Sequence, residues 1–332
     1  MNELVFFVNN VVVSGLTIGS IYALGAVGIT LIFSILRFAH FAHADLMTLG
    51  AFFAFFLTSL FPAVGPAVGL PTAFVMLPLA MALTAVSAVY IDKAFYRPLR
   101  SHGVKPIVLV MASLGVTLML QGLIRMFMGT GARSLYIDDR KEIYRIELPF
   151  DLASRPLVLT DPQILLLLFL VVAVIALHLF LTRSRLGKAM RAMSDNPDLA
   201  RVSGINTDTV VKVTWVIAGC LAAAAGTLLS LDVSLKPDLS FHLLLPIFAA
   251  AIVGGVGHPY GALAGGFVIG FAETLSVFNW SVLLRPVRDY LWFDIPANLS
   301  FVSSEYKITV PFFILLAILV WRPTGLFKGK VL

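Results

Sequence analysis

Long apolar runs separated by short polar segments make up most of this chain. The first run covers residues 11–36 and ends at Arg37. From Leu46 to Ile91 the sequence contains no Asp, Glu, Lys or Arg, and this stretch is long enough for two membrane spans of about 20 residues each. Turn-forming residues divide the stretch in its middle. They are Pro62, Gly65, Pro66, Gly69 and Pro71.

Further apolar runs predict four more spans, the last of them short. They lie at residues 106–128, 162–182, 209–231 and 308–321. Residues 239–272 again lack Asp, Glu, Lys and Arg, but they are too many for one helix and too few for two full spans. Pro246 and the glycine-rich segment 254–261 divide them, so we expect two short or discontinuous helices there.

The pattern therefore predicts an all-α polytopic membrane protein with about eight or nine transmembrane helices and a single transmembrane domain over residues 1–332. Composition supports this class, because 59% of the residues are hydrophobic and only 13% are charged, against about 25% in soluble domains. The mean hydropathy is +0.95. Because no basic segment precedes the first apolar run, we expect an uncleaved first span rather than a removable signal peptide.

Cations gather in two of the polar segments. They are Lys93, Arg97, Arg100 and Lys105 in the first, and Arg183, Arg185, Lys188, Arg191 and Arg201 in the second. Basic loops between spans stay in the cytoplasm, so the net charge of +6 indicates membrane topology and not a nucleic-acid partner. Counting membrane crossings from these two cytoplasmic loops then places the polar insert 129–161 and the N-terminus outside, with the C-terminus in the cytoplasm. The loop 183–206 either binds a cytoplasmic partner or only orients the protein.

No pattern typical of an enzyme, a metal site or a cofactor site is found. The chain lacks a phosphate-binding Gly-x-x-x-x-Gly-Lys-Ser/Thr motif, and its single cysteine, Cys220, forms neither a disulfide within the chain nor a zinc pattern. Ionisable residues near the spans are the better candidates, because charge in hydrocarbon tends to face a cavity or a partner. His40, His43, Asp45 and Glu273 are candidate pathway residues. The alternatives are a cytoplasmic turn for the first three and an interfacial position for Glu273.

Glycines at short spacings indicate close helix packing. Gly15 and Gly19 form a small-xxx-small pair in the first span. The later cluster lacks the lysine of a phosphate loop, so we expect it to serve helix packing too. It contains Gly254, Gly255, Gly257 and Gly261.

Several motifs, in order along nearly the whole chain, resemble the permease subunits of branched-chain amino-acid ABC importers, the shorter of that family's two paired permeases. They are Gly15-Leu-Thr-x-Gly19-Ser-x-Tyr22-Ala-Leu, Phe41-Ala-His-Ala, Tyr96-Arg-Pro-Leu-Arg100, Gly187-Lys-Ala-Met-Arg191-Ala, Asn196, Ala200, Gly204-Ile-Asn206, the small-residue run Ala222 to Gly226, the later glycine cluster, Gly270-x-x-Glu273 and Arg322-Pro-Thr-Gly325. No single motif is decisive, but their order and spacing together are specific.

The resemblance implies the fold of a type II ABC importer permease in a bacterial inner membrane. It also implies four kinds of partner: a second permease chain, two cytoplasmic P-loop ATPases, an extracytoplasmic solute-binding protein and the lipid bilayer. Loop 183–206 would be the coupling loop, with a helix over residues 186–203 or one starting near Ser194 and capped by Asp195 or Asn196. The residues implied in coupling to the ATPase are Gly187, Arg191, Ala192, Asn196, Ala200, Gly204 and Ile205.

Three departures from the family pattern lie in the second-span motif. His40 stands where the family usually has asparagine, Ala44 replaces the usual glycine, and Asp45 the usual glutamate. The solute therefore stays open among branched-chain amino acids, urea or short amides, and aromatic or other organic acids. An ATPase-independent channel or secondary transporter is the alternative of another class. It predicts charged pairs within several spans, and the apolar runs are nearly free of charge.

Overall fold

The computed structural model describes residues 2–137, 140–147, 155–285, 296–322 and 324–327 of the 332-residue chain. Within these ranges, seven helical segments are long and apolar enough to cross a membrane. They cover Asn2–Leu36, His43–Leu60, Leu77–Ser101, Pro106–Met128, Asp161–Arg183, Thr207–Asp232 and Pro259–Val277. Two shorter apolar segments, Phe241–Gly254 and Thr309–Trp321, accompany them. The predicted all-α polytopic fold is confirmed.

The long segments divide into helices with local changes of winding. The first comprises α1 (Asn2–Phe7), a π-helical turn η1 (Val8–Val13) and α2 (Ser14–Leu36), and the third comprises α6 (Leu77–Ile91), a second π-helical turn η2 (Asp92–Tyr96) and α7 (Arg97–Ser101). The other five are α3 (His43–Leu60), α8 (Pro106–Met128), α9 (Asp161–Arg183), α12 (Thr207–Asp232) and α14 (Pro259–Val277).

Short elements complete the chain. They are α4 (Val64–Val68), α5 (Thr72–Val75), β1 (Ile143–Ile146), β2 (Leu157–Thr160), α10 (Arg185–Asp195), α11 (Pro197–Val202), η4 (Phe241–Leu243), α13 (Leu244–Gly254), α15 (Ser281–Leu284), η6 (Ser304–Tyr306) and α16 (Thr309–Trp321). Proline lies in the first turn of α6, α8, α9 and α14. Proline suits this position because the first helical N–H groups need no partner within the helix.

Helix α2 forms the centre of the bundle and is buried along most of its length. It packs against α14, α12 and α13. Small residues set the closest approach, because a Cβ on Gly270 would meet the Gly19 backbone at 2.5 Å and one on Gly266 would meet the Ala23 backbone at 2.5 Å. By contrast, α9 exposes most of its apolar surface, as expected for a helix that faces lipid.

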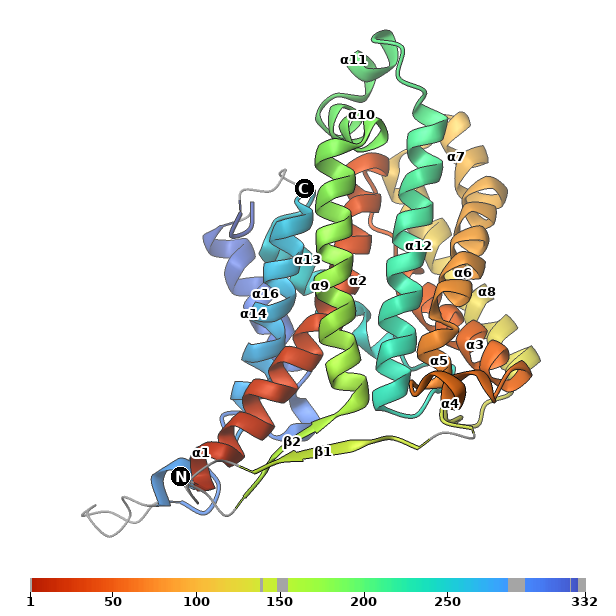
Figure 1. Ribbon diagram of the computed structural model, residues 1–332. Helices are drawn as coiled ribbons and strands as arrows, with labels where there is room; N and C mark the ends of the chain where they lie inside the picture. Colours follow the sequence, from red (N-terminus) through yellow and green to blue (C-terminus); the bar gives the residue numbers. More distant parts are fainter. Residues whose placement is uncertain (1, 138–139, 148–154, 286–295, 323, 328–332) are drawn as a thin grey trace.

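The two ends of the bundle differ in structure (Figure 1). One end carries α10 and α11, which extend beyond the long helices, and the other carries α4, α5 and the β1–β2 hairpin. The strands pair antiparallel from Ile143 opposite Thr160 to Ile146 opposite Leu157. This hairpin lies in the predicted external insert, and it is the one sheet among the described residues. The polar composition of the insert gave no sign of it.

The insert is joined to the chain that follows α12. Lys141 donates to both the carboxylate and the main-chain oxygen of Asp232, at 2.7 and 3.0 Å. Arg133 and Leu235 exchange two main-chain hydrogen bonds, of 2.8 and 2.9 Å. From there the chain turns inward without regular structure, and the N–H of Ser240 reaches the Thr48 hydroxyl of α3 at 3.4 Å.

Two helices separated by a turn are present as predicted, α13 and α14 around residues 255–258, but only α13 is short, because α14 continues to Val277 and is long enough to cross a membrane. Gly255 and Gly257 in this turn adopt φ values of 104° and 90°, which are favourable only for glycine. A Cβ on Gly257 would meet no atom within 4 Å, so this glycine is needed for its backbone conformation and not for the helix packing that we expected. Gly254 and Gly261 do pack against each other, where the two helices approach closely.

Candidate functional site

The predicted coupling loop folds into two short helices at one end of the bundle, α10 and α11 (Figure 1). The Ser184 hydroxyl accepts from the N–H of Gly187 and caps α10. Asn196 interrupts the helix, and its side-chain oxygen accepts from the N–H groups of Asp198 and Leu199 at 3.1 and 3.0 Å. An asparagine N-cap followed by proline is a favourable helix start. The segment is therefore a bent pair of helices and not one continuous helix over 186–203.

The residues proposed for coupling divide into two groups by exposure. Gly187 and Ala200 are buried, and a Cβ on Gly187 would overlap the backbone at the end of α9. Arg191, Ala192, Asn196 and Gly204 are exposed, and Ile205 is half-buried. Gly204 has a φ of 81°, which allows the chain to turn sharply after α11. We define α10, α11 and residues 203–206 as the elbow.

The elbow contacts the spans through the end of α2. Arg37, the one described non-glycine residue with positive φ, donates a hydrogen bond from its guanidinium to the carbonyl of Ser194 in α10. A cavity of about 340 Å³ lies beside this contact, lined by Arg191 of α10 and by His258 and Tyr260 at the α13–α14 turn. The elbow, the end of α2 and the glycine turn are therefore neighbours, although they lie far apart in the sequence.

The second-span candidates His40, His43 and Asp45 are all buried, and the rings of the two histidines lie 6.3 Å apart. The Nε2 of His40 lies 3.0 Å from the hydroxyl of Tyr96. Tyr96 stacks on Trp215 of α12, with ring planes 3° apart. His40 therefore lies in the turn between α2 and α3, as the turn alternative has it, but this turn is buried and contacts η2 and α12. Sequence reasoning gave no role to Tyr96 or Trp215, because no local pattern shows that they meet.

Asp45 joins α3 to α8. Its Oδ1 accepts from the side-chain amide of Gln121 at 3.0 Å, and Arg125 donates in turn to the Gln121 oxygen at 3.4 Å. A buried carboxylate needs such partners because water is absent at that depth. Gln121 and Arg125, the amide and the charged side chain in the span at 106–128, are the signal from which this contact could have been suspected.

Glu273 lies in a separate buried site between α14 and α2. Its Oε2 accepts from the Tyr22 hydroxyl at 2.6 Å, and Lys307 lies 3.5 Å from its Oε1. The Glu273 side chain is 4% exposed, whereas that of Lys307 is 55% exposed. A cavity of about 420 Å³ opens beside the pair, lined also by Asn10 and Asn279. Glu273 is therefore embedded in protein and borders a cavity.

The remaining candidates are packing positions in the first span. Gly15 lies against Phe271, and Gly19 against Phe267, both of α14. A Cβ on Gly19 would approach the ring of Phe267 to 2.8 Å and its Cα to 3.1 Å. In the described part of the chain, no group of three or more His, Cys, Asp or Glu side chains could hold a metal ion.

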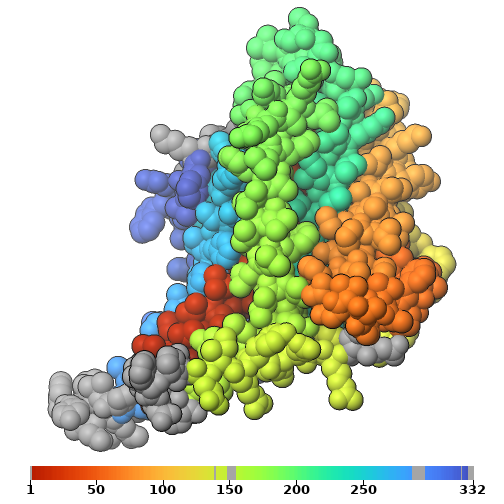
Figure 2. All heavy atoms as spheres, in the orientation of Figure 1, coloured from red at the N-terminus to blue at the C-terminus, as the bar shows by residue number. Residues whose placement is uncertain are grey.

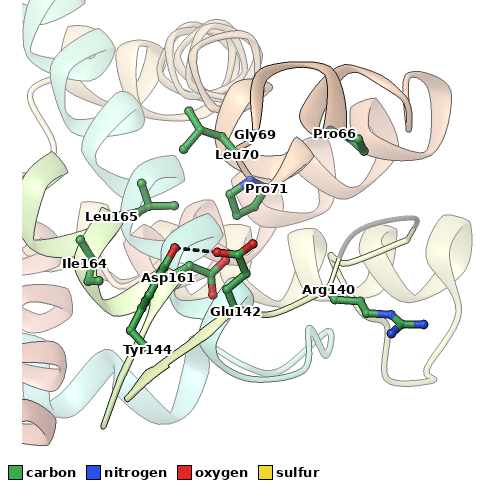
Figure 3. Close-up of a pocket in the computed structure, with 10 residues that line it drawn as sticks. All are labelled: Pro66, Gly69, Leu70, Pro71, Arg140, Glu142, Tyr144, Asp161, Ile164 and Leu165. Carbon is green, nitrogen blue, oxygen red and sulfur yellow. Dashed lines mark hydrogen bonds between the residues drawn. The ribbon is translucent and has the colours of Figure 1, made fainter. Parts of the chain in front are cut away.

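A cavity of about 490 Å³ with both apolar and charged lining residues lies at the hairpin end, between the insert and the α4–α5 turn (Figure 3). Glu142 and Asp161 approach each other there, and the Tyr144 hydroxyl donates to the Glu142 carboxylate at 2.6 Å. This hydrogen bond raises the pKa of Tyr144 above its usual value. Asp161 also accepts from the Tyr136 hydroxyl at 3.1 Å. Two carboxylates and the basic residue Arg140 therefore line this cavity at the hairpin end.

Comparison with known proteins identifies the family. The model of the family "Branched-chain amino acid transport system / permease component" matches residues 11–320. The high-affinity branched-chain amino acid transport system permease protein BraD of Pseudomonas aeruginosa is 29% identical over 324 residues, covering 95% of this chain and 94% of that protein. The corresponding LivH of Escherichia coli is 27% identical over 321 residues, covering 94% and 93%. No solved structure showed a significant match.

An archaeal relative extends the range of the family. A probable branched-chain amino acid transport permease protein LivH of Methanocaldococcus jannaschii is 29% identical over 253 residues, or 76% of each chain. A permease component is one part of a transport system, and ATPase subunits and a binding protein are its general partners in ABC systems. Matched along almost its whole length, the chain belongs to the permease components of branched-chain amino acid transport systems, and it is a multi-pass transport subunit of the inner membrane rather than an enzyme.

Proposed function

We propose that this subunit carries branched-chain amino acids into the cell, driven by ATP hydrolysis on partner chains. The observation that carries the proposal is the match to this permease family over residues 11–320, together with relatives whose names specify that solute class. In the proposed complex a second permease chain completes the pathway, two P-loop ATPases bind the cytoplasmic face, and a solute-binding protein delivers the amino acid outside.

The elbow is the proposed contact for the ATPase. It extends beyond the spans at the end that carries the basic loops, and its exposed residues Arg191 and Ala192 are accessible to a partner. Because Arg37 bonds to Ser194, a shift of α10 displaces the end of α2. The cavity beside Arg191 is lined by the glycine turn, so the same shift changes the environment of α13 and α14. ATP shifts the equilibrium between two conformations of the spans only if the ATPase binds the elbow differently in those two conformations.

We also propose a role in the pathway for His40, His43, Asp45 and Glu273. All four are buried within one subunit in this conformation. Glu273 already lines the cavity beside Lys307, whereas direct contact of a solute with His40, His43 or Asp45 requires α3 to move relative to the helices packed against it. We propose that their polar contacts define one end state of such a movement and break or rearrange in the other.

The test is uptake of labelled solutes into proteoliposomes that contain the complex as purified with its co-purifying subunits. We expect uptake of leucine when the binding protein is outside and ATP is inside, with no effect of a protonophore. Urea and benzoate serve as matched competitors for the other solute classes. Preferred uptake of urea or benzoate would replace the solute assignment, and uptake without ATP would contradict the importer mechanism and favour a channel or secondary transporter.

A further inference from the structure

An apolar groove of about 720 Å³ runs along the outer surface of the bundle between α6, α9 and α12. Figure 2 shows it as the furrow between the column of α9 and the atoms of α6. Its floor is formed where α6 and α12 meet closely, because Gly219 of α12 leaves only 3.0 Å between its Cβ position and the Ala85 backbone. Phe169 of α9 forms the opposite wall. The furrow exists because these floor residues are small.

The groove faces the hydrocarbon region of the membrane. Its rim residues Val86 and Val216 are 68% and 41% exposed, and their side chains are apolar. The lining runs along α6 from Pro78 to Val89, a rise of about 16 Å at 1.5 Å per residue. This length is close to the thickness of one leaflet, about half of a hydrocarbon core of ~30 Å. A polar solute would gain nothing from such a surface, whereas an acyl chain fills it.

Two lysines mark the cytoplasmic end of the groove. Lys93 follows Val89 by about one helical turn, and Lys212 precedes Val216 by one turn on α12. Both lysines are exposed, and neither has an ion pair or a side-chain hydrogen bond among the described residues. They are therefore cations without an ionic partner in the described part of the chain, about one helical turn beyond the groove.

A salt bridge brings the two lysines to the same place. One further turn along each helix, Arg97 and Asp208 form an ion pair of 2.8 Å that joins α7 to the start of α12. Lys93 and Lys212 occupy the turn between this ion pair and the groove. Lys93 and Lys212 therefore lie on two helices that pack together, at the end of the groove nearest the Arg97–Asp208 ion pair.

We propose that this groove binds an anionic phospholipid of the cytoplasmic leaflet, with one acyl chain between α6 and α9 and its phosphate between Lys93 and Lys212. The two lysines favour an anionic lipid over an uncharged one. The cytoplasmic leaflet is anionic, and each lysine near it contributes favourably to binding. A second permease chain that covered the same groove would have to place an acidic side chain beside Lys93 and Lys212 to neutralise them.

The experiment is a lipid titration of the purified complex in mild detergent, followed by native mass spectrometry. Phosphatidylglycerol is compared with phosphatidylcholine that carries the same acyl chains. We expect tighter binding of phosphatidylglycerol. The double variant Lys93→Gln/Lys212→Gln should weaken it about thirtyfold, at about fivefold for each lysine. The charge-matched control Lys105→Gln/Lys188→Gln removes two exposed cytoplasmic lysines away from the groove and should change binding less than twofold.

A second variant tests the groove itself. Ala82 is exposed on its rim, so Ala82→Phe fills the furrow without disturbing the α6–α12 contact, and it should lower binding of both lipids. Three results would overturn the proposal. They are equal affinity for the two lipids, unchanged affinity in either variant, or a photo-crosslink from position 86 to a protein chain instead of lipid. None of these results bears on whether the complex transports amino acids.

Discussion

At the scale of single residues, the ionisable groups inside the bundle are held by partners distant in sequence. Glu273 accepts from Tyr22, which precedes it by 251 positions, and Asp45 accepts from Gln121, which follows it by 76. Each bond joins two spans, so it fixes their relative position and gives one oxygen of a buried carboxylate a hydrogen-bond partner. Single-sequence reasoning could select Asp45 and Glu273 as unusual, because charge in a span is rare, but it could not find their partners.

The bond between Tyr22 and Glu273 should be measurable as a coupling energy. In a double-mutant cycle of Tyr22→Phe and Glu273→Gln, we expect about 1–2 kcal/mol of coupling in the free energy of unfolding in detergent, in the upper range of interhelical hydrogen bonds in membranes. The control cycle of Lys307→Gln and Glu273→Gln should give less than about 0.5 kcal/mol, because Lys307 is 55% exposed and 3.5 Å away. Equal coupling in both cycles would show that Tyr22 is not the principal partner.

At the scale of elements, the pattern of apolar runs predicted the helices well and their contacts only partly. The expected span at 106–128 coincides with α8, and the break near Gly254 separates α13 from α14. The bend at Asn196 could be expected from the asparagine–proline pair, whereas the β1–β2 hairpin could not, because its residues do not alternate between apolar and polar. Strand pairing across residues 147–156 depends on contacts that a single sequence does not contain.

Close helix crossings predict a strong dependence on glycine at defined positions. A Cβ on Gly226 of α12 would overlap the backbone of Met47 in α3, so Gly226→Ala should force these helices apart. We expect a loss of about 2–4 kcal/mol, since backbone atoms cannot yield as a flexible side chain can. Gly122→Ala in α8 is the matched control, because a Cβ there meets no atom within 4 Å and alanine favours the helix. Thermal unfolding in detergent should show a lower melting temperature for Gly226→Ala than for Gly122→Ala. Similar melting temperatures would refute the claim that α12 and α3 need glycine at position 226.

The cap at Asn196 should control the second half of the elbow. Asn196→Ala removes the acceptor for the N–H groups of Asp198 and Leu199 and should destabilise α11 by about 1 kcal/mol. Hydrogen exchange of the amides at 198–202 should then be about fivefold faster, while α12 is unchanged. Asn196→Asp keeps an acceptor oxygen, so its amides at 198–202 should exchange at the same rate as those of the natural chain. Unchanged exchange in Asn196→Ala would mean that packing, and not the cap, holds α11.

At the scale of the whole molecule, the elbow, the end of α2 and the α13–α14 turn form one contiguous region at the proposed cytoplasmic end. The opposite end is joined in a comparable way, because Lys141 and Arg133 of the insert bind the chain that leads into α13. The discontinuous helix α13 is therefore connected to both faces. Its position suits an element that changes with the state of the ATPase on one side and with the binding protein on the other.

The central claim is that the conformational change driven by ATP hydrolysis is transmitted to the spans through the elbow. The variant Arg191→Glu tests this claim most directly. In proteoliposomes that contain the complete complex, we would measure leucine uptake and binding-protein-stimulated ATP hydrolysis for the natural chain and for this variant. Lys105→Glu, an equal change of charge in the other cytoplasmic loop, is the control. The account predicts that Arg191→Glu lowers both rates at least tenfold while membrane insertion is normal and the control is little affected. Unchanged uptake and unchanged stimulation in Arg191→Glu would contradict it.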